Sequence, residues 1–189
     1  MLRAAEKEST PTWCLVLLLG AMGLRVSEAC ALAVGDLSAG PGPVRIRVRR
    51  KGGVRETLEV PEPIADGLKG LARGRLESAL LIASASGRWL SRRQAHRIVA
   101  RLGERAGIPR PVHPHLLRHS FVSLALVAGA PLVAVSVAAG HRDLTTTLGY
   151  AHALGQGGSR PVAEVVLGSL AGVALQDGAF FDASGRAEG

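Results

Sequence analysis

The sequence predicts a mainly helical α+β domain with a small antiparallel three-stranded β-sheet. Several apolar segments of helical length are separated by glycine or proline, which predicts helices joined by short turns. Residues 44–49 and 55–60 alternate in polarity on either side of Gly52-Gly53, which predicts a β-hairpin. The chain has 189 residues, 47% of them hydrophobic and 3% aromatic, so its core has to consist of aliphatic side chains.

Local start and stop signals place the first elements in order. Pro11 predicts the start of a buried helix over 11–21, and Gly23 follows its end. Ser27 predicts the cap of a short helix over 28–33. The first hairpin strand is predicted to point three apolar side chains inward, those of Val44, Ile46 and Val48.

The elements after the hairpin follow from the same signals. Ser91 predicts the start of a helix that Gly107 ends, and Gly129-Ala130-Pro131 separates two further apolar helices. The predicted elements are a helix over 64–75, a third strand over 79–83, helices over 91–106, 116–128, 132–139, 145–152 and 162–175, and a glycine-rich linker at 156–161.

Two apolar stretches raise the question of a membrane span, and the sequence argues against one. Residues 13–24 are too few to cross a bilayer, and residues 120–140 are interrupted by Gly129-Ala130-Pro131. The two cysteines, Cys14 and Cys30, form neither a disulfide framework nor a Cys-x-x-Cys zinc motif. We therefore expect a reduced, cytoplasmic protein, of bacterial type and associated with the nucleoid, with no membrane partner.

The charge of the chain favours a polyanionic partner. Lysine and arginine number 23 against 15 acidic residues, which gives a formal charge of +8 and a pI near 10.9. Basic side chains concentrate in the hairpin and recur at every fourth position of the helix over 91–106. Such stripes suit DNA phosphates. The residues predicted to contact DNA are Arg45, Arg47, Arg49, Arg50, Arg93, Arg97 and Arg101.

Four segments carry residue types suited to phosphodiester chemistry. They contain Arg25, Lys51, the pair His115 and Arg118, and the pair His141 and Tyr150, of which Tyr150 is the single tyrosine. Two guanidinium groups can bind the non-bridging oxygens of one phosphodiester and stabilise the charge of a pentavalent transition state. A tyrosine oxygen can attack phosphorus, and a lysine can protonate the leaving oxygen. The sequence therefore predicts a DNA-cleaving site that needs no metal and no cofactor.

These four segments resemble the sequence boxes of the tyrosine recombinases, or phage integrases. Residues 23–28 are similar to the first-arginine box, 49–53 to the hairpin lysine box, 114–121 to the second-arginine box, and 138–152 to the box that holds the nucleophile. The resemblance covers roughly residues 12–155, and four boxes in the family order make it specific. It implies the integrase-type catalytic core of DNA breaking-rejoining enzymes.

The resemblance also implies a role for each matching residue. Arg25 and Arg118 would clamp the scissile phosphate, and Glu28 would orient Arg25. The remaining implied roles are Lys51 as general acid toward the 5′-hydroxyl leaving group, His115 and His141 as hydrogen-bond partners of the phosphate or aids to proton transfer, and Tyr150 as the nucleophile that forms a 3′-phosphotyrosyl link.

From this resemblance we expect a site-specific recombinase or integrase. Relaxation of DNA in the manner of a type IB topoisomerase, and a non-catalytic DNA-binding remnant of a mobile element, are the alternatives. Residues 1–155 would form the catalytic domain without the core-binding domain that usually precedes it, and 156–189 a linker, a C-terminal helix and a frayed tail. Expected partners are double-stranded DNA, further copies of the chain up to a tetramer on DNA, and accessory DNA-bending proteins.

Overall fold

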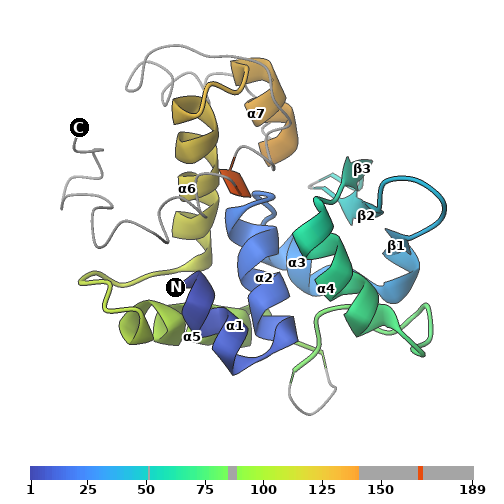
Figure 1. Cartoon of the computed structure of the whole chain (residues 1–189), viewed down its shortest axis with the longest axis horizontal. Helices are drawn as coiled ribbons and strands as arrows, with labels where there is room; N and C mark the ends of the chain where they lie inside the picture. Colours follow the sequence, from blue (N-terminus) through green and yellow to red (C-terminus); the bar gives the residue numbers. More distant parts are fainter. Residues whose placement is uncertain (51, 85–88, 141–165, 168–189) are drawn as a thin grey trace.

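Residues 1–50, 52–84, 89–140 and 166–167 are described by a computed structural model, and they confirm the predicted fold class (Figure 1). Helices enclose a central helix, and a small three-stranded antiparallel sheet lies to one side. The helices are α1 (Leu2–Glu8), α2 (Thr10–Gly20), α3 (Val26–Ala31), the 3-10 turn η1 (Val34–Asp36), α4 (Glu62–Ala72), α5 (Arg92–Arg105), α6 (Pro114–Val127) and α7 (Leu132–Ala139). The strands are β1 (Leu37–Ser38), β2 (Arg45–Arg49) and β3 (Arg55–Glu59).

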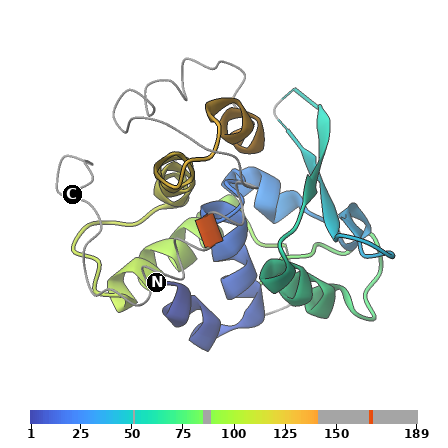
Figure 2. The same ribbon diagram turned by 45° about the horizontal axis from the view of Figure 1, so that its top comes forward.

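Helix α2 is the centre of the core and packs against α1, α3, α4 and α6 (Figure 2). Every residue from Cys14 to Gly20 is buried, so the predicted buried helix over 11–21 is confirmed. Ser9 accepts a hydrogen bond from the Thr12 amide, and Pro11 lies in the first turn. None of the described helices combines the length and the apolar character needed to cross a membrane.

The hairpin has the predicted alternation. Ile46 and Val48 are fully buried, whereas the three arginines of β2 are exposed. Ile46 lies opposite Leu58 in β3, and Leu37 pairs with Ile46 from the other side, which gives the strand order β1-β2-β3. This register buries one face of the sheet and leaves the charged face in solvent.

The predicted third strand over 79–83 is wrong, although the sheet does have three strands. Its place is taken by β1, and residues 79–83 form only isolated bridges. The Leu81 amide donates to the Leu32 carbonyl at 2.7 Å, and the Val34 amide donates to the Ala79 carbonyl at 2.8 Å. The segment therefore pairs with the chain that leaves α3, and Leu81 and Ile82 are buried in the same core as Ile46 and Val48 without joining the sheet.

Two helices begin earlier than predicted because another residue caps them. Helix α3 begins at Val26, since the Arg25 amide donates to the Glu28 carboxylate at 2.8 Å; Ser27 is therefore not the cap. Helix α6 begins at Pro114, where Nδ1 of His113 accepts from the Leu116 amide at 3.1 Å.

The other predicted elements agree more closely with the structure. Ser91 caps α5 as predicted, and α7 has the predicted bounds 132–139. Helix α4 begins two residues before the predicted range 64–75 and ends three residues before its end. Helix α1 was not predicted. The predicted helices over 145–152 and 162–175 and the linker at 156–161 lie outside the described residues, apart from Val166, which is buried in the core, and Leu167, which packs against it.

Candidate active site

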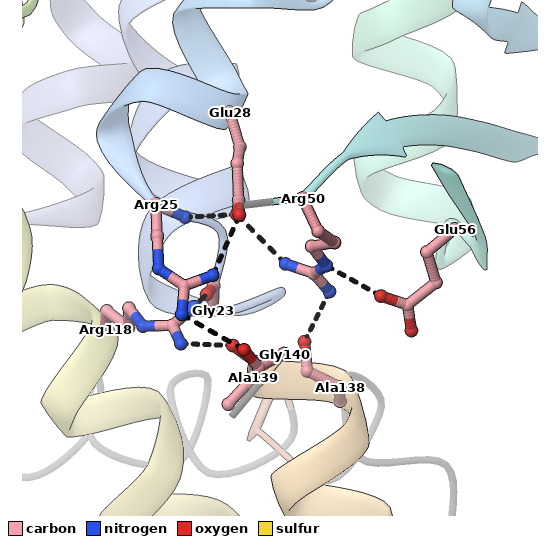
Figure 3. Close-up of polar contacts among 9 residues, drawn as sticks. All are labelled: Gly23, Arg25, Glu28, Arg50, Glu56, Arg118, Ala138, Ala139 and Gly140. Atoms are coloured by element: carbon pink, nitrogen blue, oxygen red, sulfur yellow. Dashed lines mark hydrogen bonds and ion pairs between the residues drawn. The ribbon is translucent and has the colours of Figure 1, made fainter. Parts of the chain in front are cut away.

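The predicted arginine pair lies at the C-terminal end of α7, where α3, α6 and the hairpin also converge (Figure 3). Three guanidinium groups donate to three successive backbone carbonyls of this end. Arg50 bonds Ala138 at 2.9 Å, Arg118 bonds Ala139, and Arg25 bonds Gly140 at 3.0 Å. The last carbonyls of a helix lack intrahelical donors and carry partial negative charge, so they attract cations. The helix end thus gathers arginines from three separate elements.

Gly140 ends α7 in the left-handed conformation, with φ 60°. A Cβ atom at this position would lie 3.0 Å from Cζ of Arg50. Glycine therefore satisfies both the backbone conformation and the close approach of a guanidinium group. The next residue in the sequence is His141, so the arginine cluster contacts the first three residues of the predicted nucleophile box, 138–152.

Glu28 is the carboxylate that joins two of these arginines. Its side chain is only 3% exposed. Oε1 accepts from Nη1 of Arg25 at 2.9 Å, and Oε2 accepts from the Arg25 amide at 2.8 Å and from Nη1 of Arg50 at 2.9 Å. A buried carboxylate with three charge-assisted or backbone donors fixes the direction of both guanidinium groups.

Arg118 reaches the cluster from α6 and is 5% exposed. It donates to the carbonyls of Gly23 and Ala139, and Gly23 has the left-handed φ of 65°. Burial, and then the charge of Arg25, lower the pKa of Arg118 to about 10. The guanidinium is still protonated at neutral pH. Because burying it beside another cation is unfavourable, an anion bound there would be stabilised.

A pocket of about 230 Å³ opens beside Arg118 and Arg25. It lies between the first turns of α3, α5 and α6. Its lining residues are Leu24, Arg25, Val26, Ser27, Arg92, His96, Pro114, His115 and Arg118. The structure therefore brings together three predicted site residues, Arg25, His115 and Arg118, on one concave surface of strongly basic character.

His115 and His119 lie on successive turns of α6, with their Nε2 atoms 2.7 Å apart. At this separation one Nε2 is protonated and donates a hydrogen bond to the other Nε2. Burial is the largest cause that lowers the pKa of His115, followed by the charges of His113, Arg118 and Arg25. Burial and then His115 lower the pKa of His119. Both imidazoles are therefore favoured in their neutral form at pH 7.

Arg92 and His96 line the pocket, and sequence reasoning missed both. The predicted basic stripe runs along positions 93, 97, 101 and 105 of α5, which is the face next to the one that enters the pocket. A signal was present, because a helix that begins after Ser91 places residues 92 and 96 on one face in its first turns.

The structure corrects the assignment of Arg50 as a DNA contact. Its side chain is 7% exposed, and each of its three nitrogen atoms has a partner: Glu28, Glu56 and the Ala138 carbonyl. Arg50 does not line the pocket described above, and each of its nitrogens already has a protein partner, so the structure does not present this guanidinium to a phosphate.

The other predicted DNA contacts are exposed and fall into two groups. Arg45 pairs with Glu59, Arg47 with Asp36, and Arg101 with Glu8, which also binds Arg105. Within the described residues, Arg49, Arg93 and Arg97 form no ion pair and no side-chain hydrogen bond. Arg49 also lies directly opposite Arg55 in the hairpin, an arrangement of like charges that an anion would relieve.

Three predicted site residues, Lys51, His141 and Tyr150, lie outside the described residues. Across residues 1–50, 52–84, 89–140 and 166–167, no group of three or more His, Cys, Asp or Glu side chains is arranged to hold a metal ion.

Comparison with known proteins gives matches over most of the chain. A model of the phage integrase family matches residues 1–156. The tyrosine recombinase XerA of Pyrococcus furiosus is 36% identical over 140 residues, which are 72% of this chain and 48% of the relative. The tyrosine recombinase XerD of Mycobacterium tuberculosis is 36% identical over 141 residues, 70% of this chain and 45% of the relative. The chain spans about half the length of these curated relatives.

Solved structures show the same fold. A crystal structure of XerA recombinase superposes with a TM-score of 0.69 at 24% identity, covering 90% of this chain and 61% of that one. The XerH site-specific recombinase bound to difH substrate, in a pre-cleavage complex, gives 0.68 at 25% identity, over 79% and 47% of the two chains. A lambda integrase dimer bound to a COC′ core site gives 0.64 at 20% identity, over 84% and 47%.

Proposed function

This chain belongs to the phage integrase family, and we propose that it breaks and rejoins DNA at specific sites through a covalent tyrosine intermediate. The observation that carries the proposal is the meeting of Arg25, His115 and Arg118 in one pocket, although 93 residues separate the two arginines. Among the described residues, Arg25 and Arg50 pair with two carboxylates, Glu28 and Glu56, whereas Arg118 donates only to backbone carbonyls. The site therefore has a net positive charge that suits one phosphodiester.

The two arginines have the chemistry to stabilise the transition state. Nη1 and Nη2 of Arg25 and of Arg118 each use one N–H on a fixed protein acceptor, which leaves further N–H groups for the non-bridging oxygens of a phosphate. Because these donors are held by Glu28 and by backbone carbonyls, they need no reorganisation when charge develops on the oxygens. Arg25 and Arg118 are thus the proposed phosphate clamp.

The remaining site residues have roles in the covalent step. The phenolic oxygen of Tyr150 attacks phosphorus, the bond from phosphorus to the 5′ oxygen breaks, and the ammonium group of Lys51 gives that oxygen a proton. A neutral imidazole accepts the phenolic proton, and the lowered pKa of His115 keeps its imidazole neutral at pH 7. His141 adds a hydrogen bond to the phosphate. Rejoining reverses each step, with a 5′-hydroxyl as the nucleophile.

We infer that double-stranded DNA is the substrate, with Arg49, Arg93 and Arg97 as phosphate contacts outside the pocket. Their exposure and their lack of ion pairs and side-chain hydrogen bonds within the described residues support this choice over the paired arginines. Among the similar structures, the XerH recombinase is bound to its difH substrate and the lambda integrase is a dimer bound to a core site, which supports DNA-dependent assembly of several copies. Residues 1–155 are the proposed catalytic domain.

A nicked suicide DNA tests the proposal. Cleavage beside the nick releases a short strand, so the chain stays covalently joined to the DNA and migrates more slowly on a denaturing gel. We expect an adduct in wild-type protein that persists in excess EDTA and is lost in Tyr150→Phe, which keeps the ring and removes one oxygen. DNA binding without any adduct would favour the non-catalytic remnant, and relaxation of plasmids without site preference would favour topoisomerase-like activity.

A further inference from the structure

Arg50 has an environment that its sequence context did not predict. It follows β2 directly and is the residue at which the hairpin turn closes: its amide donates to the Val54 carbonyl at 2.8 Å, and its carbonyl accepts from the Gly53 amide at 3.1 Å. Its side chain does not continue the exposed arginines of β2. It turns inward toward α3 and α7, as Figure 3 shows.

Each nitrogen of the Arg50 guanidinium binds a different element. Nε donates to Glu56 of β3 at 2.6 Å, Nη1 to Glu28 of α3 at 2.9 Å, and Nη2 to the Ala138 carbonyl of α7 at 2.9 Å. The guanidinium places these donors on three separate nitrogens, whereas a lysine ammonium would have to reach all three acceptors from one nitrogen, so lysine is a poor replacement. Arg50 therefore connects the hairpin to the same carboxylate and the same helix end that hold Arg25.

This connection matters because Lys51 is the next residue in the sequence. On the proposed function, Lys51 has to deliver a proton to the leaving oxygen while Arg25 and Arg118 hold the phosphate. A hairpin joined to the body only through its strands would let the position of its tip vary relative to the clamp. Contacts of Arg50 with Glu28 and Ala138 remove this freedom one residue before the acid.

We propose that Arg50 is a positioning residue for the general acid: it fastens the hairpin tip to Glu28 and to the end of α7, so that Lys51 meets the leaving oxygen. The inference rests on the proposed function. It differs from a phosphate-binding role, because Arg50 does not line the pocket of Arg25 and Arg118 and has a protein partner on every nitrogen. It also differs from a purely structural role, because it predicts a defect confined to protonation of the leaving group.

The test compares two suicide substrates that differ in one atom. In the first, the leaving group is the natural 5′ oxygen; in the second, sulfur replaces it. A thiol has a pKa near 8.5, so the sulfur leaves as a thiolate without an acid. General acid catalysis contributes about 10²-fold to 10⁴-fold, so we expect Arg50→Ala to lose at least roughly tenfold in the rate of adduct formation on oxygen and to regain most of it on sulfur. Lys51→Ala should show the same pattern.

Three further variants make the comparison decisive. Arg118→Ala should be slow on both substrates, because clamping of the phosphate is needed for either leaving group. Glu56→Gln removes the charge from the partner that lies on the hairpin and leaves Glu28 in place, so it should give a milder form of the Arg50→Ala pattern and serves if Arg50→Ala fails to fold. Glu59→Gln is the matched control on the same strand, since its pair with Arg45 is exposed.

If Arg50→Ala lowers the rate of adduct formation equally on the oxygen and the sulfur substrate, the inference is overturned in favour of a clamping or structural role. If only Glu56→Gln folds, the same outcome for that variant overturns it. An unchanged rate on oxygen would overturn it as well. If wild-type protein forms no adduct with either substrate, the proposed function itself fails. If wild-type protein forms the adduct but the defect of Arg50→Ala is the same for both leaving groups, only the present inference fails.

Discussion

Glu28 and Arg50 form an ion pair of 2.9 Å across 22 residues of sequence, and their side chains are 3% and 7% exposed. The same carboxylate binds Arg25, so one buried acid sets the direction of a proposed clamp residue and of the hairpin residue before Lys51. Removing one partner of a buried pair leaves the other charge uncompensated. The arrangement thus makes the stability of the domain and the geometry of its site depend on one side chain.

Replacement of Glu28 by glutamine tests that dependence. Loss of one member of a buried ion pair costs about 3–5 kcal/mol, so Glu28→Gln should lower the free energy of unfolding by an amount in this range. The matched control is Glu59→Gln, whose pair with Arg45 is exposed and should contribute no more than about 1 kcal/mol. Urea denaturation of the three proteins measures both values, and similar losses in the two variants would contradict the role of Glu28.

Arg118→Ala should weaken transition-state stabilisation while leaving weak DNA binding. Loss of one preorganised donor to a developing oxyanion costs roughly 3–4 kcal/mol, or about 10²-fold to 10³-fold in rate. Single-turnover formation of the covalent adduct on the suicide DNA measures the effect. A rate within a few fold of wild type, in a variant that unfolds like wild type, would remove Arg118 from the clamp.

Gly23→Ala should destabilise the domain through two separate effects. The left-handed backbone disfavours any side chain, and a Cβ atom would overlap the Phe121 ring. Gly74→Ala is the control, because Gly74 has a similar φ of 69° but open space around it. Gly74→Ala should cost about 1 kcal/mol, and Gly23→Ala should cost about 1–3 kcal/mol more for overpacking. Thermal denaturation compares them, and equal costs would mean that Phe121 moves aside freely.

Acidification should destabilise the fold through the histidines of α6. The pKa values of His115 and His119 are lowered in the folded state, chiefly by burial, whereas the unfolded chain titrates near its ordinary value of about 6.5. Below that value the unfolded state binds more protons, so stability rises with pH up to about 6.5 and then levels off. Urea midpoints of wild type and His119→Gln across this range measure the effect. A wild-type profile that is flat, or equal to that of the variant, would contradict it.

The salt dependence of DNA binding should differ between variants of exposed arginines that have an acidic partner and variants of those that have none. Each phosphate contact contributes about 0.9 to the slope of log K against log salt, so Arg97→Ala should reduce the slope by about that amount. Arg101 lies on the same face of α5 but is paired with Glu8, so Arg101→Ala should change the slope less. Fluorescence anisotropy with a labelled duplex measures both slopes. Identical changes would mean that DNA releases Arg101 from Glu8.

Elements with strong local signals were predictable from the sequence. The alternation of β2 predicted which side chains face the core, and Ser91 marked the start of α5 as observed. The third strand was not predictable, because residues 79–83 are as apolar as a strand but find their hydrogen-bond partners at Leu32 and Val34. Nothing in the segment itself identifies those partners, which depend on where α3 ends.

The candidate site divides in the same way. Spacing and residue type singled out Arg25, His115 and Arg118, and the structure places all three in one pocket. They do not indicate that His96 lines the pocket or that Nε2 of His119 lies 2.7 Å from that of His115. These contacts depend on the rotation of α5 and α6 about their axes, which only packing against the rest of the core determines.

The sequence by itself determined which side chains are suited to a phosphodiester and which face of the hairpin is buried. Tertiary structure alone decided that, of the seven arginines in and around β2 and α5 that were predicted to contact DNA, six are exposed and one is buried. Arg45, Arg47, Arg49 and Arg50 follow one another closely in the chain, yet only Arg50 meets Glu28 and the end of α7. The physical reason is that a charged side chain can be buried only where segments distant in the sequence supply its partners and exclude water. The residues next to it in the chain do not determine either condition.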